Sequence, residues 1–95
     1  MIQVPISEKA LNDLFSGDTE GDFAEFKYDV GIERFVGDVV NHRFHRMTIP
    51  TRQAWIWKRL QKEFPQDYKQ VSLILAFSPA EWEEVGDPVR EALFE

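Results

Sequence analysis

The sequence predicts a small α+β domain of 95 residues. Hydrophobic residues recur with helical spacing near the N-terminus and over residues 48–64, they alternate with polar residues over residues 23–40, and they form a nearly continuous run at residues 71–77. A chain of this length folds around a single core. We therefore expect one domain spanning residues 1–95, with the element order α-β-β-α-β-α and a further short helix at the end.

Capping signals in the sequence indicate where the first helix begins and ends. Ser7 can accept hydrogen bonds from free backbone N–H groups as the N-cap, and Ile6 and Leu11 occupy the two positions of a hydrophobic staple. Gly17 can take the left-handed conformation that ends many helices. The helix between them has one apolar face, formed by Ala10, Leu11, Leu14 and Phe15.

Residues 23–40 predict an antiparallel hairpin. In its first half, apolar and charged residues alternate, as in a strand with one face exposed to water. The apolar members are Ala24, Phe26, Tyr28 and Val30. Gly31 then allows a tight reversal, and residues 32–40 form a second run of β-branched and aromatic residues.

A long helix follows the segment 42–47. Thr48 is a plausible N-cap, Pro50 is tolerated in the first turn, and Pro65 requires the helix to end at about Phe64. The helical period places Ile49, Gln53, Ile56, Trp57, Leu60 and Phe64 on one face. The opposite face then carries Arg52, Trp55, Lys58, Arg59 and Lys62.

The last third begins with a strand at residues 71–77, which we expect to be more buried than the first two because it is almost entirely apolar. Ser78-Pro79-Ala80-Glu81 is a capping box with proline at the first helical position. Gly86-Asp87-Pro88 ends that short helix and begins a last one, which carries Val89, Ala92, Leu93 and Phe94.

The composition excludes several classes of protein. The chain contains no cysteine, so it has no disulfide, no thiolate zinc site and no cysteine nucleophile. Its N-terminus lacks the basic start and apolar run of a signal peptide, and its longest apolar stretch is too short to cross a bilayer. We expect a cytoplasmic protein with no membrane partner.

Charge is distributed unevenly along the chain, whose net charge is -6. Residues 39–63 hold six bases and one acid, which gives +5. Residues 1–38 hold nine acids and three bases (-6), and residues 64–95 hold seven acids and two bases (-5). The basic middle third between acidic flanks indicates a binding surface for an acidic partner, whereas the overall acidity argues against non-specific binding of a polyanion.

The element order and three stretches of sequence resemble the BolA-like family. These stretches are residues 39–47 (VVNHRFHRM), residues 52–60 (RQAWIWKRL) and residues 78–82 (SPAEW). The resemblance implies a class II KH-like fold, in which a three-stranded mixed sheet carries its helices on one face. It also implies a monothiol glutaredoxin as protein partner, with which members of the family share a [2Fe–2S] cluster.

This chain departs from the family pattern where that cluster is held. Gln70-Val71-Ser72 stands in place of a stretch that contains a ligand histidine, and Gly31 marks a loop shorter than the one that offers a second ligand. Phe44-His45-Arg46 replaces a turn that contains glycine. An amide is a poor ligand for an iron–sulfur cluster, so we expect no cofactor held by this chain, and sharing of a [2Fe–2S] cluster is doubtful.

The candidate site residues lie in the basic middle third: His42, Arg43, His45, Arg46, Arg52, Trp55, Lys58 and Arg59. The two histidines are either a metal or proton-transfer pair or two surface residues, and the adjacent arginines favour the second alternative. Trp55 is either an exposed anchor among cations or a residue covered by another element. The basic face is either a binding surface or an ordinary solvated helix face. We expect no metal site, no catalytic group and no enzyme activity.

Two functions from different classes fit these residues. The first is a BolA-like adaptor that binds a protein partner, a monothiol glutaredoxin in the family, through the turn at Arg43–Met47 and the face with Arg52, Trp55 and Arg59. The alternative is a regulator that binds nucleic acid through the KH-like surface, although the sequence lacks the Gly-x-x-Gly loop of KH modules. A third possibility is an unrelated acidic protein that binds or inhibits a partner.

Overall fold

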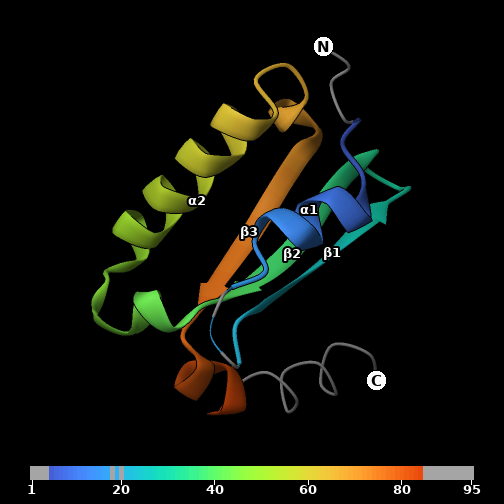
Figure 1. Ribbon diagram of the computed structural model, residues 1–95. Coiled ribbons are helices and arrows are strands. Elements are labelled where there is room, and N and C mark those ends of the chain that lie inside the picture. Colours follow the sequence, from blue (N-terminus) through green and yellow to red (C-terminus); the bar gives the residue numbers. More distant parts are fainter. Residues whose placement is uncertain (1–4, 18, 20, 85–95) are drawn as a thin grey trace.

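A three-stranded mixed sheet with helices on one face organises the chain (Figure 1). The computed structural model describes residues 5–17, 19 and 21–84. The strand order is β1-β2-β3, with β1 antiparallel to β2 and β2 parallel to β3. The elements are α1 (Glu8–Leu14), β1 (Phe23–Asp29), β2 (Arg34–Val40), the 3₁₀ turn η1 (His42–Arg46), α2 (Ile49–Glu63), the 3₁₀ turn η2 (Tyr68–Gln70) and β3 (Val71–Phe77). The α+β class and the mixed sheet are confirmed.

Helix α1 begins where the sequence predicts and ends differently. Ser7 Oγ accepts a hydrogen bond from Ala10 N–H at 3.0 Å, which confirms the N-cap. Phe15, with φ -103°, is the C-cap, and Gly17 does not take the left-handed conformation that we expected. Glycine is needed at position 17 for a different reason, because a Cβ there would overlap the side chain of Asp22.

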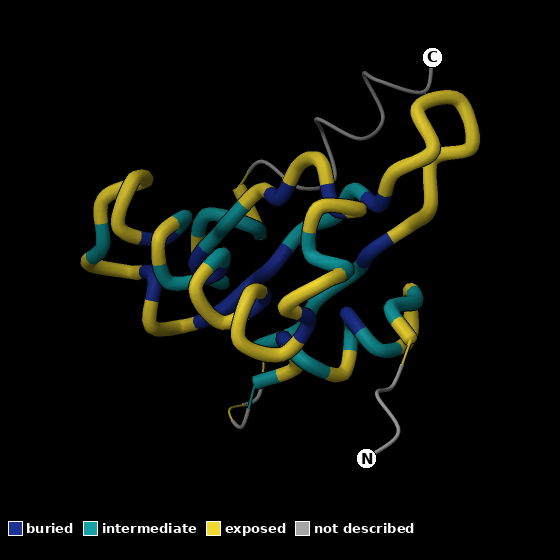
Figure 2. The backbone as a smooth tube through the Cα atoms, turned by 90° about the horizontal axis from the view of Figure 1, so that it is seen from above, coloured by how far each residue is buried: buried dark blue, intermediate teal, exposed yellow. Residues whose placement is uncertain are grey.

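The β1–β2 hairpin has the predicted antiparallel pairing, but its turn is longer than Gly31 suggests. Strand β2 starts at Arg34, two residues later than predicted, and Asp29 pairs with Arg34 across a four-residue turn. The left-handed residue in this turn is Glu33 (φ 55°), while Gly31 N–H donates to Asp29 Oδ1 at 2.9 Å. Residues 27–34 are all exposed, so the tip of the hairpin extends beyond the core (Figure 2).

Gly37, in the middle of β2, allows the two strands to pack against the helices. It pairs with Phe26 across the hairpin, and a Cβ at position 37 would overlap the Phe26 ring and lie 2.8 Å from the Glu25 carbonyl oxygen. Phe26 itself is buried and stacks on Phe15 of α1, with ring centroids 5.8 Å apart. Glycine here makes the space that the Phe26 ring fills.

Helix α2 has the predicted ends: Thr48 is the N-cap, Pro50 lies in the first turn and Phe64 is the C-cap. Its buried stripe differs from the predicted one. Ile56 and Leu60 are buried as expected, but Ile49 is 70% exposed and the first buried side chain is Arg52, one turn before Ile56. The stripe that faces the sheet therefore begins with a cation.

One core lies between the sheet and the two helices. Both α1 and α2 pack on the same sheet face, together with Phe44 from η1. The buried residues of this cluster are Leu11, Phe15, Phe26, Phe35, Val39, Phe44, Ile56, Leu60, Phe64, Val71 and Ile74.

Strand β3 has the predicted bounds but is not buried along its whole length. Val71 and Ile74 belong to the core, whereas Leu73 and Leu75 are 53% and 46% exposed. Strand β3 is therefore not more buried than β2, and our prediction that it would be more buried than the first two strands is wrong. At the carboxyl end of β3, Phe77 contacts Trp82, with ring centroids 5.4 Å apart.

Side chains of α1 and α2 form hydrogen bonds with backbone groups of the two outer strands, β1 and β3. On β1, Phe26 N–H donates to Asn12 Oδ1 at 2.7 Å and Tyr28 N–H donates to Glu8 Oε2 at 2.8 Å. On β3, the Ile74 and Ala76 carbonyl oxygens accept from Gln53 Nε2 at 2.8 Å and Arg52 Nη1 at 3.2 Å. These bonds satisfy groups that an edge strand otherwise offers to another chain, so they disfavour edge-to-edge pairing.

The predicted capping box is also confirmed. A helical turn begins at Pro79 and its described part extends over residues 79–84. Ser78 N–H donates to Glu81 Oε1 at 2.8 Å, and Glu81 N–H donates to Ser78 Oγ at 3.3 Å. The predicted stop at residues 86–88 and the last helix lie outside the described residues.

Candidate functional site

A pocket of about 140 Å³ lies where α1, η1 and the middle of α2 meet. It is near the carboxyl end of β2, which leads directly into η1. The polar side of the pocket includes Arg43 and Arg59, and its apolar side includes Trp55. The full lining is Leu14, Phe15, Ser16, Gly17, Asp22, Asn41, His42, Arg43, Trp55 and Arg59. Four of the candidate residues therefore line one cavity: His42, Arg43, Trp55 and Arg59.

Trp55 combines the two alternatives that the sequence left open. It is half-buried, and its ring contacts Phe15 and Phe44, with centroid distances of 6.5 and 5.7 Å. The guanidinium carbons of Arg43 and Arg59 also lie 4.6 and 5.5 Å from its ring centroid. Trp55 is thus anchored in the core and holds two cations at the surface through cation–π contacts.

The local sequence positions Arg43 beside this ring. The Asn41 side chain accepts from Arg43 N–H at 3.0 Å as the N-cap of η1. Phe44 is fully buried and fixes the turn to the core, so the residues on either side of it face outward. His45 and Arg46 are exposed and do not line the pocket.

His42 is held by a residue that the sequence did not identify. Asp22 accepts from His42 N–H at 2.9 Å with Oδ1 and contacts His42 Nδ1 at 2.8 Å with Oδ2. The Asp22 side chain is only 1% exposed. This pairing fixes the ring of His42 and leaves Nε2 as the ring nitrogen available to a ligand. The 20-residue separation in sequence explains why no local pattern indicates it.

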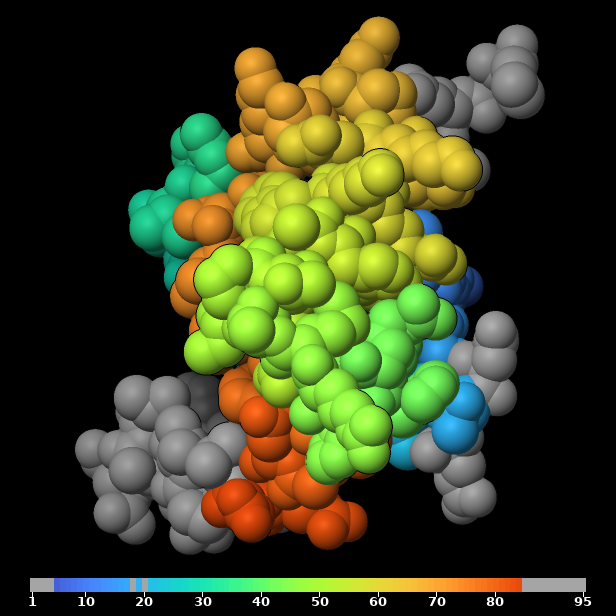
Figure 3. Space-filling view, turned by 90° about the vertical axis from the view of Figure 1, so that its left-hand side faces the viewer, coloured from blue at the N-terminus to red at the C-terminus, as the bar shows by residue number. Residues whose placement is uncertain are grey.

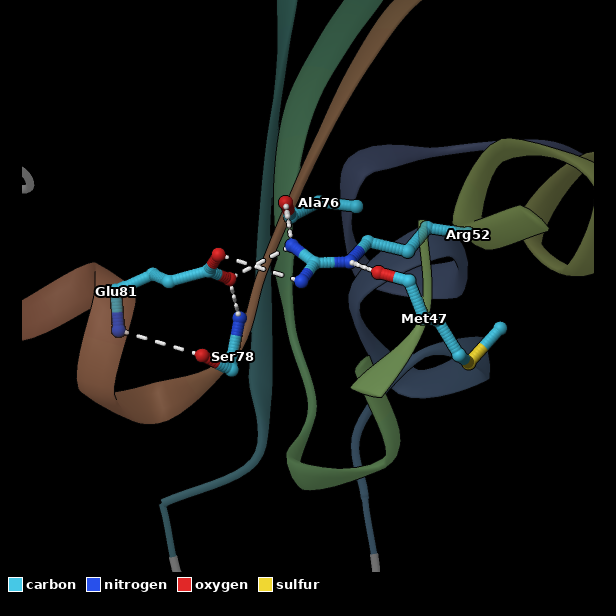
Figure 4. A network of polar contacts seen from close by, with 5 residues as sticks. All are labelled: Met47, Arg52, Ala76, Ser78 and Glu81. Atoms are coloured by element: carbon cyan, nitrogen blue, oxygen red, sulfur yellow. Dashed lines mark hydrogen bonds and ion pairs between the residues drawn. The ribbon is translucent and has the colours of Figure 1, made fainter. Parts of the chain in front are cut away.

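Arg52 is not a surface residue, which corrects our expectation for the basic face. It is 6% exposed, and its guanidinium donates to four acceptors (Figure 4). Nε donates to the Met47 carbonyl oxygen at 3.0 Å and Nη1 to the Ala76 carbonyl oxygen at 3.2 Å. Nη1 and Nη2 also donate to Glu81 Oε1 and Oε2 at 2.7 and 3.3 Å. The cation connects α2, η1 and the turn after β3.

The environment of Glu81 stabilises its charged form. The Arg52 guanidinium, and then the Ser78 N–H, lower the pKa of Glu81 from 4.5 to about 2. Glu81 therefore serves both as the capping-box partner that the sequence predicts and as the counter-ion of Arg52, which the sequence does not show. Neither Arg52 nor Glu81 lines the pocket.

The remaining candidates are exposed cations near the pocket. Lys58 is exposed on α2, next to Arg59 in sequence, and Arg46 is exposed on η1. Figure 3 shows η1 beside α2 on one face of the molecule. We define the basic surface as His42, Arg43, His45, Arg46, Trp55, Lys58 and Arg59. It contains every candidate except Arg52.

Among residues 5–17, 19 and 21–84, no cluster of three or more His, Cys, Asp or Glu side chains has the geometry of a metal site. None of the helices in this part of the chain combines the length and apolar character that a membrane span requires.

Comparisons of the chain with protein-family profiles, with curated proteins and with solved structures gave no match. The resemblance to BolA-like proteins and the cytoplasmic location therefore stay predictions.

Proposed function

We propose that the protein is a non-enzymatic adaptor that binds an acidic protein partner through its basic surface. The observation that carries this proposal is the arrangement of Arg43 and Arg59 on the ring of Trp55. Within the described residues, neither arginine forms an ion pair with a carboxylate, so their charges are available to a partner. Aromatic and arginine side chains are enriched among the residues that dominate binding energy at protein interfaces.

The contrast with Arg52 supports a binding role for these two arginines. Arg52 is buried and its hydrogen-bond donors are occupied by Glu81 and by main-chain carbonyls, as a structural cation requires. Arg43 and Arg59 are exposed, and Arg59 Nε makes a single long contact of 3.4 Å with the Leu14 carbonyl oxygen. The fold thus uses one cation of the basic middle third internally and leaves the others at the surface.

A monothiol glutaredoxin is the specific partner that we propose, on the basis of the sequence resemblance. The resemblance covers η1, the first part of α2 and the residues after β3. Because the expected histidine ligand is replaced by Gln70-Val71-Ser72, we propose a complex that does not depend on a shared [2Fe–2S] cluster.

The test is calorimetric titration of the full chain with a monothiol glutaredoxin, with and without cluster. Arg46→Glu/Lys58→Glu reverses two exposed charges that do not line the pocket, and it should weaken binding and reduce its salt dependence. Lys69→Glu is the matched control, because Lys69 is exposed on η2, outside the basic surface. Absence of a complex in both states would eliminate glutaredoxin as partner.

The same reversal separates protein binding from nucleic-acid binding. If the unmodified protein binds single-stranded RNA or DNA at physiological salt, and the reversal abolishes that binding, the alternative of a nucleic-acid regulator replaces the adaptor. The net charge of -6 leads us to expect no such binding.

A further inference from the structure

We propose that the Trp55 pocket is a clamp for one carboxylate, carried by an Asp or Glu side chain of the protein partner. This inference rests on the proposed function and adds the chemistry by which the partner is recognised. The remaining exposed cations of the basic surface attract the partner, whereas the pocket, with Arg43 and Arg59, selects a single side chain.

The size of the pocket limits what can enter it. Its volume is about 140 Å³. Sites for cofactors, nucleotides and other drug-sized ligands usually measure about 300–1,000 Å³, so this pocket is too small to enclose a nucleotide. One short side chain with a planar anionic group does. The small volume therefore favours a residue of a partner over a free cofactor.

The charge of the lining favours a monoanion. Arg43 and Arg59 contribute two positive charges, and Asp22 contributes one negative charge that is already bound to His42. Without counting His42, these side chains sum to a formal charge of +1, which matches a carboxylate more closely than a dianionic phosphate ester. Guanidinium groups also match the two oxygens of a carboxylate in a planar, bidentate geometry.

The pocket is organised before a ligand arrives. Trp55 is fixed by Phe15 and Phe44, and it holds the guanidinium groups of Arg43 and Arg59 by cation–π contact. Asp22 fixes the ring of His42 at the same cavity. A ligand therefore does not have to order long, freely rotating arginine side chains, which is one of the main costs of binding.

The experiment uses the full ¹⁵N-labelled chain and three blocked tripeptides, Ac-Gly-Glu-Gly-NH₂, Ac-Gly-Gln-Gly-NH₂ and Ac-Gly-phosphoSer-Gly-NH₂. The Glu and Gln peptides differ only in the carboxylate. We expect the Glu peptide to shift the Trp55 indole N–H and the Arg43 and Arg59 Nε–H resonances saturably, and to bind about tenfold more tightly than the Gln peptide.

Single substitutions identify the residues that bind the Glu peptide. Arg43→Ala and Arg59→Ala should each weaken binding of the Glu peptide by about tenfold, the loss expected for one charge-assisted hydrogen bond. Lys69→Ala is the control, because Lys69 is an exposed cation of η2 outside the basic surface and the pocket, and it should leave the affinity unchanged. Each variant is first compared with the parent protein by its amide spectrum, so that loss of folding is recognised.

Three outcomes would overturn the clamp. These are equal affinity for the Glu and Gln peptides, equal effects of Lys69→Ala and Arg59→Ala, or tighter binding of the phosphoserine peptide. Glutaredoxin binding could depend on the exposed charges while the Glu peptide causes no saturable shift of the pocket resonances. In that case the clamp fails and the adaptor function remains. If the Glu peptide shifts the Trp55 indole N–H resonance saturably but no glutaredoxin binds, the clamp stands. Glutaredoxin is then not the protein that supplies the carboxylate.

Discussion

Arg52 Nη1 lies 2.7 Å from Glu81 Oε1, and this ion pair joins the first half of α2 to the helical turn that follows β3. The same guanidinium binds the Met47 carbonyl oxygen before α2 and the Ala76 carbonyl oxygen within β3. One side chain therefore fixes the start of α2 against the end of β3. Its loss should affect stability, whereas loss of a basic-surface arginine should affect binding.

Arg52→Met is expected to lower the free energy of unfolding by about 3 kcal/mol, measured by urea denaturation. Methionine retains much of the aliphatic stem but leaves the Met47 and Ala76 carbonyl groups without their donor and Glu81 without its counter-ion. Arg46→Met is the control, since Arg46 is exposed, and it should change stability by no more than about 0.5 kcal/mol. Equal effects of the two substitutions would show that the buried network is not stabilising.

The lowered pKa of Glu81 predicts an acid-sensitive contribution to stability. Because the folded-state pKa is about 2 and the reference value is 4.5, the contribution is complete above about pH 4.5 and is lost as the pH falls toward 2. Glu81→Gln removes this titration, so the stability difference between parent and variant should shrink over that window. The Glu81 side chain is 45% exposed, so solvent screening makes the effect smaller than the full pKa shift implies. A difference that stays constant down to pH 2 would contradict this assignment.

Gly37→Ala should destabilise the protein by about 2 kcal/mol, because the added methyl group overlaps the Phe26 ring and approaches the Glu25 carbonyl oxygen. Thermal or urea unfolding measures the loss. Gly31→Ala is a matched control: its Cβ would meet only the Asp29 carboxylate oxygen at 3.2 Å, which a small side-chain rotation relieves. If Gly31→Ala proves the more damaging of the two, the packing argument is wrong.

Asn12→Leu should remove the acceptor of the Phe26 N–H on β1, at a cost of about 1 kcal/mol. The specific readout is amide hydrogen exchange, which should accelerate at Phe26 more than at amides in the middle of β2. Asn12→Asp keeps an acceptor oxygen at the same place and should restore slow exchange. Unchanged exchange at Phe26 in the leucine variant would show that this bond does not protect the edge.

Most of the fold could be predicted because its signals are local. Ser7, Thr48 and the Ser78–Glu81 capping box each mark a helix start with groups a few residues apart, and all three occur in the structure. Alternation over residues 23–40 gave the hairpin. Its turn was misplaced because Gly31 was taken as the point of a tight reversal, whereas the turn spans residues 30–33 and Glu33 is its left-handed residue.

The site was only partly predictable, because its decisive contacts join distant residues. Arg52 was placed on the surface because charged side chains are usually exposed, although its position one turn before Ile56 puts it on the buried stripe. Its partner Glu81 is 29 residues away, and Asp22 lies 20 residues from His42. Local patterns do not show such pairs. The grouping of Arg43 and Arg59 on Trp55 likewise required the arrangement of η1 against α2.

The hydrogen bonds from Asn12, Glu8, Gln53 and Arg52 to the outer strands have a consequence for partner choice. A partner that adds a strand to a sheet is held mainly by backbone groups, which every protein has, so this mode of binding discriminates weakly between sequences. Here four of those backbone groups, two on β1 and two on β3, already bond to side chains of the same molecule. If the protein binds its partner as we propose, recognition depends on side chains such as Arg43 and Arg59, and a single substitution in the partner can decide whether it binds.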